Sequence, residues 1–294
     1  MTGEQVVADF VGRFARNPES ASHEEPKRGR IVMSQKRLVV AADDERLTIP
    51  LSKVVDVVVG NVPPNLRDLF DSTVTIGYKS DETDAIETIL IEGSDETMSK
   101  FQTVAFKSLL KGTKAKIKHP ARIGGRVTDE PVRKAKIGID PERVTFRTNA
   151  GNVRIDITSV VGFKRTERAP DGTSRPTLLV KHADGGQVST SLIAPLSARR
   201  LNILGRFLRV NYSELLEEAS DIELNKSQKR LLVTIYATGG DIDFGSVLSG
   251  DAARATNVLN ALREKGLISE DGDGISLTSI GRIIVSQRLE DVNI

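Results

Sequence analysis

The sequence contains no cysteine or tryptophan among its 294 residues, and it has only three histidines, His23, His119 and His182. The absence of cysteine excludes disulfides, thiolate metal sites and thiol catalysis, and it fits a reducing cytoplasm. No apolar stretch approaches the ~18 residues that a membrane span requires. The N-terminus also lacks the basic start and unbroken apolar run of a signal peptide. These absences predict a soluble, cytoplasmic protein without membrane insertion.

Motifs of catalysis are equally scarce. No GxxxxGK[ST] phosphate loop occurs anywhere in the chain. The carboxylate pair Asp43–Asp44 falls in a predicted turn with no nucleophile near it. His119 precedes Pro120 within a basic segment, and we expect its ring to be exposed to solvent. The sequence therefore predicts no enzymatic activity, no metal site and no cofactor.

An internal repeat organises most of the chain. RIVMSQKRLVVAADDERLTIPLSKVVDV (30–57) aligns without a gap with KIGIDPERVTFRTNAGNVRIDITSVVGF (136–163), and apolar residues alternate with polar ones in both. Each copy continues with two more predicted strands, at 74–78 and 85–91 in the first and at 177–181 and 187–193 in the second. An amphipathic helix closes each copy. Six or seven antiparallel strands capped by one helix are typical of a pleckstrin-homology-like barrel.

At the N-terminus, apolar residues recur at helical rather than strand spacing. They are Val6, Val7, Phe10, Val11 and Phe14. Thr2 and Gln5 stand where a capping box would place them. We therefore expect the first repeat to begin with a helix.

The residues from 221 onward follow the element order of a winged helix-turn-helix domain. Asn225 is placed to cap a first helix, Phe244–Leu248 form a short second one, and DAARATNVLNALREKG (251–266) forms the third. Two short strands then flank an acidic turn, and Ser279 caps a closing helix. The chain is thus predicted to be α+β, with two tandem pleckstrin-homology-like β-barrel domains followed by a winged helix-turn-helix domain. The expected domains are 1–118, with the N-terminal helix, 119–215, ending in a long helix, and 216–294.

This winged helix lacks the features of a DNA reader. Its third helix begins at Asp251 and offers only Arg254 and Asn257 to reach bases, and the wing EDGDG (270–274) carries three carboxylates. Phosphate neutralisation by cations supplies most of the affinity for DNA, so an acidic wing opposes binding. A winged-helix DNA-binding transcriptional regulator with a sensory N-terminal half is the alternative, and it would need cations from another part of the chain.

Positive charge is concentrated in KGTKAKIKHPARIGGRVTDEPVRKAK (111–136), which holds nine basic and two acidic side chains. A solvated linker, a site for nucleic acid or anionic lipid, and a docking site for an acidic protein all fit such a run. No aromatic residue interleaves the lysines to stack on bases. We favour a linker first and an acidic or motor partner second. The cations available to a partner are Lys114, Lys116, Lys118, Arg122, Arg126, Arg133, Lys134 and Lys136.

The long helix expected over 198–222 carries apolar residues at seven-residue spacing. Leu201, Leu208, Leu215 and Ile222 form the repeat, and Asn211 stands at the intervening position. Such a stripe fits either a linker helix packed on its own neighbours or a parallel helix pair between two subunits, with Asn211 setting the register. Both interpretations stay open.

The closing helix has a second apolar stripe opposite its core face. Either this stripe docks a protein or a second subunit, or the terminal residues fold back onto the chain. The residues of the predicted docking surface are Val285, Leu289, Glu290, Asp291, Val292 and Ile294.

RIVMSQKRL (30–38) with KIGIDPERV (136–144), VPPNLRDLF (62–70) and the tail NALREKGLI…ISLTSIGRIIVSQRLEDVNI together resemble the archaeal taxis protein CheF family over nearly the whole chain. The resemblance implies a homodimeric adaptor that links phosphorylated CheY to switch-complex proteins at the cytoplasmic base of the archaellum. It also implies that the C-terminal domain receives CheY. Bacterial CheY binds short acidic, apolar motor helices, and by that analogy Leu289, Glu290, Asp291 and Val292 are the expected contacts. The repeats and the basic segment are left for the motor complex.

Overall fold

The computed structural model describes residues 4–18, 26–43, 45–60, 62, 70, 72–81, 85–184, 187–238, 252–271 and 274–285. Its contacts divide the chain into two compact units. One unit comprises residues 1–116, 134–153 and 195–208, and the other comprises 117–133, 154–194 and 209–294. The three domains expected from the sequence are a different kind of division, and they stay a prediction.

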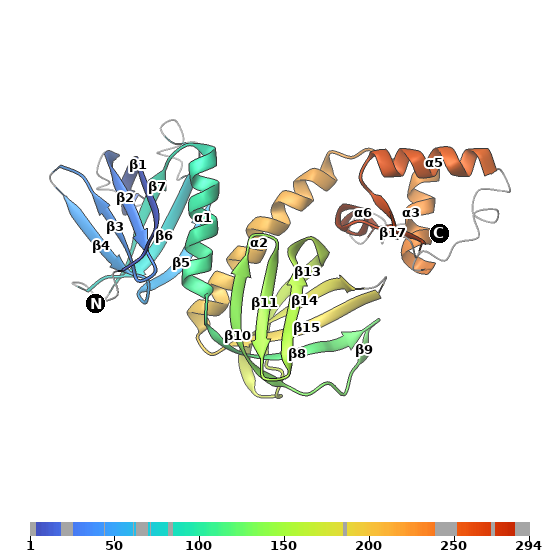
Figure 1. Ribbon diagram of the computed structural model, residues 1–294, viewed down its shortest axis with the longest axis horizontal. Helices are drawn as coiled ribbons and strands as arrows, with labels where there is room; N and C mark the ends of the chain where they lie inside the picture. The colour runs from blue at the N-terminus through green and yellow to red at the C-terminus, as the bar shows by residue number, and fades with distance from the viewer. Residues whose placement is uncertain are drawn as a thin grey trace. The chain divides into compact units, whose positions relative to one another are not determined.

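The first sheet is antiparallel and has seven strands in the order β4-β3-β2-β1-β7-β6-β5 (Figure 1). Helix α1 follows it and packs on β1 and β6. The bounds are β1 Val6–Arg16, β2 Lys27–Ser34, β3 Arg37–Ala41, β4 Arg46–Pro50, β5 Val54–Val59, β6 Thr73–Lys79, β7 Ile86–Glu92 and α1 Asp95–Leu110.

The second sheet repeats this topology, with the order β12-β11-β10-β8-β15-β14-β13 and a short strand β9 paired to β8. Helix α2 follows it. The bounds are β8 Lys114–Ile123, β9 Arg126–Val127, β10 Arg133–Asp140, β11 Arg143–Thr148, β12 Gly151–Asp156, a 3-10 turn Ile157–Ser159, β13 Val160–Arg168, β14 Ser174–Asp184, β15 Gln187–Pro195 and α2 Ala198–Ser220. With β8 in the place of β1, the two strand orders are identical, so the sequence repeat extends to the whole sheet.

The predicted N-terminal helix is wrong, because Val6–Arg16 form strand β1 at the centre of the first sheet. β1 pairs antiparallel with both β2 and β7. Phe14 is 2% exposed, and the Phe10 ring packs edge-on against Phe101 of α1 with centroids 5.3 Å apart. A Cβ on Gly12 would overlap the carbonyl oxygen of Glu92, so glycine lets the strands approach closely here. Tertiary pairing on both sides outweighs the local helical spacing.

The predicted barrels are also not closed. Among the described residues, β4 and β5 are the two edges of the first sheet, and β12 and β13 are the two edges of the second. β4 ends at Pro50, which has no N–H to donate to a further strand, and the chain then turns through Leu51–Lys53 before β5 begins. The fold is α+β with two large antiparallel sheets and few helices.

The C-terminal elements are α3 Lys226–Thr238, α5 Ala252–Glu264, the hairpin β16 Ile268–Asp271 with β17 Gly274–Leu277, and α6 Ser279–Ile284. Asn225 caps α3 as predicted, since its Oδ1 accepts from the Gln228 N–H at 2.9 Å. The cap of α6 is Thr278 rather than Ser279, because the Thr278 hydroxyl accepts from the Gly281 N–H at 3.2 Å. The short helix predicted at Phe244–Leu248 lies outside the described residues.

Over the part of the chain that the structure describes, no helix combines the length and the apolar character needed to cross a membrane.

Candidate functional site: the basic face of the second sheet

The basic segment 111–136 is not a linker, which corrects the favoured interpretation of the sequence. It forms β8, β9 and β10, and β8 and β10 are neighbours inside the second sheet. Apolar residues at alternate positions are buried, among them Ala115 and Ile117 on β8 and Ile137 and Ile139 on β10. The lysines occupy the intervening positions and therefore stand on the opposite face. In the sequence, the run of positive charge concealed the alternation of buried and outward residues that is typical of a strand.

Four of these outward lysines and Arg147 of β11 gather around a hollow of about 500 Å³. Lys136 on β10 lies directly opposite Arg147 on β11. Within the described part of the chain, Lys114, Lys134, Lys136 and Arg147 form no ion pair or side-chain hydrogen bond. We call this group the lysine cluster: Lys114, Lys116, Lys134, Lys136 and Arg147.

In the first sheet, by contrast, many cations form ion pairs with carboxylates. Arg13 forms a bidentate ion pair with Glu92, with N–O distances of 2.9 and 3.0 Å. Arg30 is paired in the same way with Asp9, at 2.8 and 2.6 Å. The other pairs there include Arg16–Glu45, Arg16–Glu87, Lys27–Glu45 and Arg37–Glu4. Two sheets of one topology thus differ in charge compensation, and the second keeps a positive surface of the kind that favours association with negatively charged groups.

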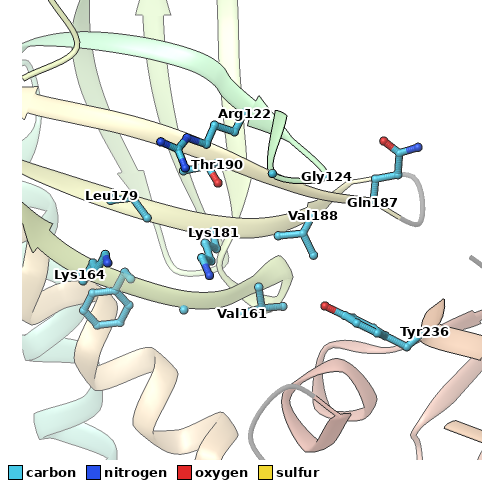
Figure 2. A pocket seen from close by; sticks show the side chains of 13 residues that line it. Arg122, Gly124, Val161, Lys164, Leu179, Lys181, Gln187, Val188, Thr190 and Tyr236 are labelled. Atoms are coloured by element: carbon cyan, nitrogen blue, oxygen red, sulfur yellow. The ribbon is translucent and has the colours of Figure 1, made fainter. Parts of the chain in front are cut away.

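A second basic feature lies on strands β8, β13, β14 and β15. Arg122, Lys164 and Lys181 surround Leu179 and Thr190 in a groove of about 720 Å³ (Figure 2). A smaller hollow of about 320 Å³ shares Arg122, Leu179 and Thr190 with this groove and adds further residues. We call both together the basic groove, and its cations are Lys118, Arg122, Lys164, Arg168 and Lys181.

The cations of the basic groove are largely uncompensated. Among the described residues, the side chains of Arg122, Lys164 and Lys181 form no ion pair or hydrogen bond. No aspartate or glutamate belongs to the described residues that line the two hollows. Lys118 donates to the Thr128 carbonyl oxygen at 2.9 Å. The groove is therefore suited to a ligand that brings its own negative charges.

Sequence reasoning found only part of this face. Lys118 and Arg122 were predicted as partner contacts, and they do line the groove. Lys164, Arg168 and Lys181 were missed, although every second residue of their strands points outward, because only the sheet order brings these strands beside β8. Two other predicted cations lie elsewhere: Arg126 is exposed on β9, and Arg133 pairs with Glu130 at 3.0 Å.

His119 is half-buried rather than exposed, which corrects a further expectation. Its Nδ1 lies 2.8 Å from the hydroxyl of Ser191, and His182 Nε2 lies 3.0 Å from the same oxygen. The two imidazole rings stack with centroids 5.3 Å apart. Ser191 is fully buried between them. This cluster belongs to the interior of the second sheet, because the strand alternation of β8 turns His119 away from the lysines.

The N-terminal half of the predicted helix seam is buried within the chain. Leu201 and Leu208 of α2 are each 3% exposed. Asn211, Leu215 and Ile222 are partly exposed, but Asn211 and Ile222 have partners within the chain. Both leucines pack within this chain. A contact between two copies through this stripe stays a prediction.

The predicted docking surface of the closing helix falls mostly outside the described residues, which end at Val285. Val285 itself is 4% exposed and packs within the chain. In the adjacent hairpin, Glu270 forms an ion pair with Arg263 of α5. Leu289, Glu290, Asp291, Val292 and Ile294 lie beyond the described part, and their role stays a prediction.

The described side chains of this face can bind anionic groups. Lysine and arginine side chains on a sheet hold carboxylates or phosphates by charge-assisted hydrogen bonds, and they need no nucleophile to do so. Within the described residues, no three histidine, aspartate or glutamate side chains gather where they could hold a metal ion.

Two full-length relatives come from Halobacterium salinarum. Taxis protein CheF2 is 42% identical over 99% of this chain and 99% of its own length, and Taxis protein CheF1 is 22% identical over 98% of each. Among solved structures, Vav1 inhibited by an allosteric inhibitor covers 53% of this chain and 39% of its own, at 9% identity and a TM-score of 0.29, which does not establish a common fold. The sequence model of the family described as archaeal chemotaxis signal transduction system protein F matches residues 6–214. With that match across both sheets and a relative 42% identical from end to end, the chain belongs to the CheF family of archaeal chemotaxis signalling proteins.

Proposed function

We propose that this chain is a non-enzymatic adaptor that binds phosphorylated CheY and couples it to the switch complex of the archaellum motor. Its membership in a family of taxis proteins places it in chemotaxis signalling. The observation that carries the adaptor role is the uncompensated positive face of the second sheet. A surface of this kind recruits an acidic partner, and it does so without any catalytic group.

The scaffold proposed for this role has two kinds of module. Each repeat has seven main strands in one order and ends in a helix, which supports two pleckstrin-homology-like domains of open rather than closed form. The order α3, α5, β16, β17, α6 supports a winged helix at the C-terminus. Both kinds of module would present sheet faces and helix faces to partners. In this proposal the basic sheet face serves the motor complex and the C-terminal module serves CheY.

The C-terminal module is the proposed receiver of CheY because its acidic and apolar residues suit a lysine-bearing partner. Glu270 and Asp271 belong to the hairpin, and the tail RLEDVNI (288–294) combines leucine, valine and isoleucine with two carboxylates. Phosphorylation must change the affinity of CheY for the adaptor, since a partner that binds both forms equally shifts no equilibrium. The proposed place of action is the cytoplasmic base of the archaellum, with the adaptor acting as a homodimer.

The test is a calorimetric titration of the full chain with CheY of the same organism, once inactive and once carrying a phosphate mimic. Tighter binding of the activated form would support the adaptor role. No heat from either form, in a sample that unfolds cooperatively, would contradict it. In that case a duplex DNA titration should follow, because affinity that falls steeply with salt would identify a DNA-binding regulator instead.

A tail variant locates the CheY contact. Leu289→Gln with Val292→Gln should weaken binding of activated CheY while the unfolding temperature stays the same. The matched control is Leu196→Gln, because Leu196 is an apolar residue that is 49% exposed and lies in the other contact unit. Unchanged affinity in the tail variant would remove these residues from the proposed contact.

A further inference from the structure

The basic groove has an apolar floor with cations on both sides. Leu192 of β15 lies directly opposite Leu179 of β14, and Leu179 lies opposite Lys164 of β13. On the other side of β15 lies β8, where Lys118 lines the same hollow as Leu192. One row across four strands therefore holds a lysine, two leucines and a lysine.

The neighbouring row adds polar groups to this pattern. Lys181 of β14 lies directly opposite Thr190 of β15, and Arg122 of β8 lines the groove beside Thr190 (Figure 2). Gly162 of β13 pairs with Lys181, and the space around its Cα is open. Two cations again stand on either side of a small polar residue, although in this row the β13 position is Gly162 and the cation lies one strand further in.

The floor of the groove is unusual for the outward face of an antiparallel sheet, which is normally polar. Leu179, Leu192 and Val188 are half-buried there and have the unpaired cations of the groove around them. Burying apolar side chains at such a place gains free energy from the hydrophobic effect, and the flanking charges fix the orientation of the ligand. A ligand that covers the apolar floor and also pairs with the flanking cations must carry apolar groups in its middle and acidic groups at its ends.

The spacing of the strands sets the size of that ligand. The row from Lys164 to Lys118 crosses three interstrand spacings of about 4.8 Å, which is roughly 14 Å. An extended peptide covers this distance in about four or five residues at about 3.3 Å each. Two acidic side chains separated by a pair of apolar residues would therefore reach both sides of the groove.

We propose that the basic groove binds a short acidic protein segment whose apolar side chains cover Leu179 and Leu192 and whose carboxylates pair with Lys164 and Lys181 on one side and Lys118 and Arg122 on the other. The inference rests on the proposed adaptor function for the identity of the partner protein, and it adds the chemistry by which that partner is recognised.

Charge and shape together favour a protein segment over nucleic acid or lipid. A phosphate backbone would pair with the cations but would leave the two leucines uncovered. Bases would need rings on which to stack. Of the two described aromatic residues that line the groove, Phe163 of β13 packs its ring edge-on against Tyr212 of α2, with centroids 5.8 Å apart, which leaves the single ring of Tyr236 of α3. A lipid headgroup would place its phosphate at one cation and not at both ends of a row.

The experiment uses the full chain and a fluorescent peptide, Glu-Glu-Ala-Leu-Leu-Ala-Glu-Glu, with binding followed by anisotropy. The first comparison peptide has glutamine in place of every glutamate, and the second has serine in place of both leucines. We expect each comparison peptide to bind at least about tenfold more weakly, because one loses the charge-assisted contacts and the other loses the apolar contact.

Variants of the chain then test whether the peptide binds in the basic groove. Lys164→Glu with Lys181→Glu should weaken binding at least about tenfold. The matched control is Lys226→Glu with Lys229→Glu on α3, which makes the same change in net charge at two exposed lysines. Equal loss in both double variants would overturn the proposal, because overall charge alone would then explain binding. Absence of binding to the unaltered chain would also overturn it.

Two further probes complete the test. A short DNA duplex and vesicles of phosphatidylserine are titrated at the same salt concentration as the peptide. Tighter binding of either, lost in Lys164→Glu with Lys181→Glu, would assign the groove to nucleic acid or lipid and would overturn the proposal. The same double variant is also titrated with activated CheY. If the double variant still binds CheY but no longer binds the peptide, the proposed peptide site in the groove is supported. If the unaltered chain does not bind CheY, the proposed function is contradicted, but the peptide site is not.

Discussion

Arg206 of α2 and Asp56 of β5 lie 150 positions apart in the sequence and form a bidentate ion pair, with Nε–Oδ1 and Nη2–Oδ2 distances of 3.2 and 2.9 Å. Two further contacts join α2 to other elements of the same unit. Arg199 donates to the Ser52 carbonyl oxygen at 2.6 Å, and Phe207 packs edge-on against Phe106 of α1. The beginning of α2, which follows the second repeat, thus packs on the first repeat.

The ion pair should contribute measurably to the stability of that packing. In a double-mutant cycle of Asp56→Ala and Arg206→Ala, we expect a coupling free energy of about 0.5–1 kcal/mol, because the two side chains are 33% and 39% exposed and solvent screens them. The measurement is urea unfolding at low and high salt. The control cycle is Asp9→Ala with Arg30→Ala, whose side chains are 40% and 65% exposed. Coupling no larger than in the control would contradict a special role for the pair.

Gly12 is expected to be the least replaceable glycine of the first sheet. In Gly12→Ala the new Cβ would overlap the Glu92 carbonyl oxygen, and backbone cannot move aside cheaply in a strand paired on both sides. We expect a loss of about 2–3 kcal/mol in the free energy of unfolding. Gly77→Ala is the matched control, since its nearest neighbour would be a Val55 methyl group at 3.5 Å, an ordinary contact. Thermal unfolding of both variants gives the comparison, and equal losses would exclude the steric explanation.

The repeat could be predicted from the sequence, but its central strand could not. β1 and β8 occupy the same place in the two sheets, and sequence reasoning missed both. In β1 the valines and phenylalanines happen to follow the helical period, and in β8 the lysines conceal the alternation of Ala115, Ile117 and Ala121. Both strands pair with a strand that comes about seventy residues later, β7 and β15 respectively. No local pattern encodes such a partner.

The candidate site shows the same limit. Its positive charge was evident in the segment 111–136, because a charge run is a local property of the sequence. The groove itself needs Lys164 and Lys181 beside Arg122, and only the order β8-β15-β14-β13 brings them together. The unpaired state of these cations depends equally on the absence of nearby carboxylates among the described residues, which composition cannot reveal. The sequence thus showed where positive charge is concentrated, but the groove is formed only by the order of the strands in the sheet.

Tyr78 should make the fold sensitive to alkali. Its side chain is 5% exposed, and its hydroxyl donates to Glu87 at 2.8 Å. Burial, together with the hydrogen bond to Glu87, raises the pKa of Tyr78 from 10.0 to about 12. Because the folded state holds the proton more tightly than the unfolded state, this contribution is complete below pH 10 and is lost as the pH rises toward 12. It amounts to about 3 kcal/mol.

The comparison of the unaltered chain with Tyr78→Phe isolates this contribution. We expect the free energy of unfolding of the unaltered chain to fall more steeply between pH 10 and 12, the interval between the two pKa values. The difference in ultraviolet absorbance between the two proteins should report phenol ionisation with a midpoint near 12. Ionisation at the ordinary pKa, or parallel loss of stability in both proteins, would show that Tyr78 is not held by its surroundings.

A substitution at Leu208 distinguishes a role of α2 in the core of one chain from a role between two subunits. Because its side chain is 3% exposed, Leu208→Ala should leave a cavity and lower the free energy of unfolding by about 2–5 kcal/mol. A residue of the core acts within one chain, so the fall in unfolding temperature should be the same at low and high protein concentration. A residue of a subunit seam would instead make the fall depend on concentration, by mass action. Leu215→Ala, at a partly exposed position of the same stripe, is the matched control and should cost less. A concentration-dependent shift in Leu208→Ala would restore the seam and require α2 to leave its own fold.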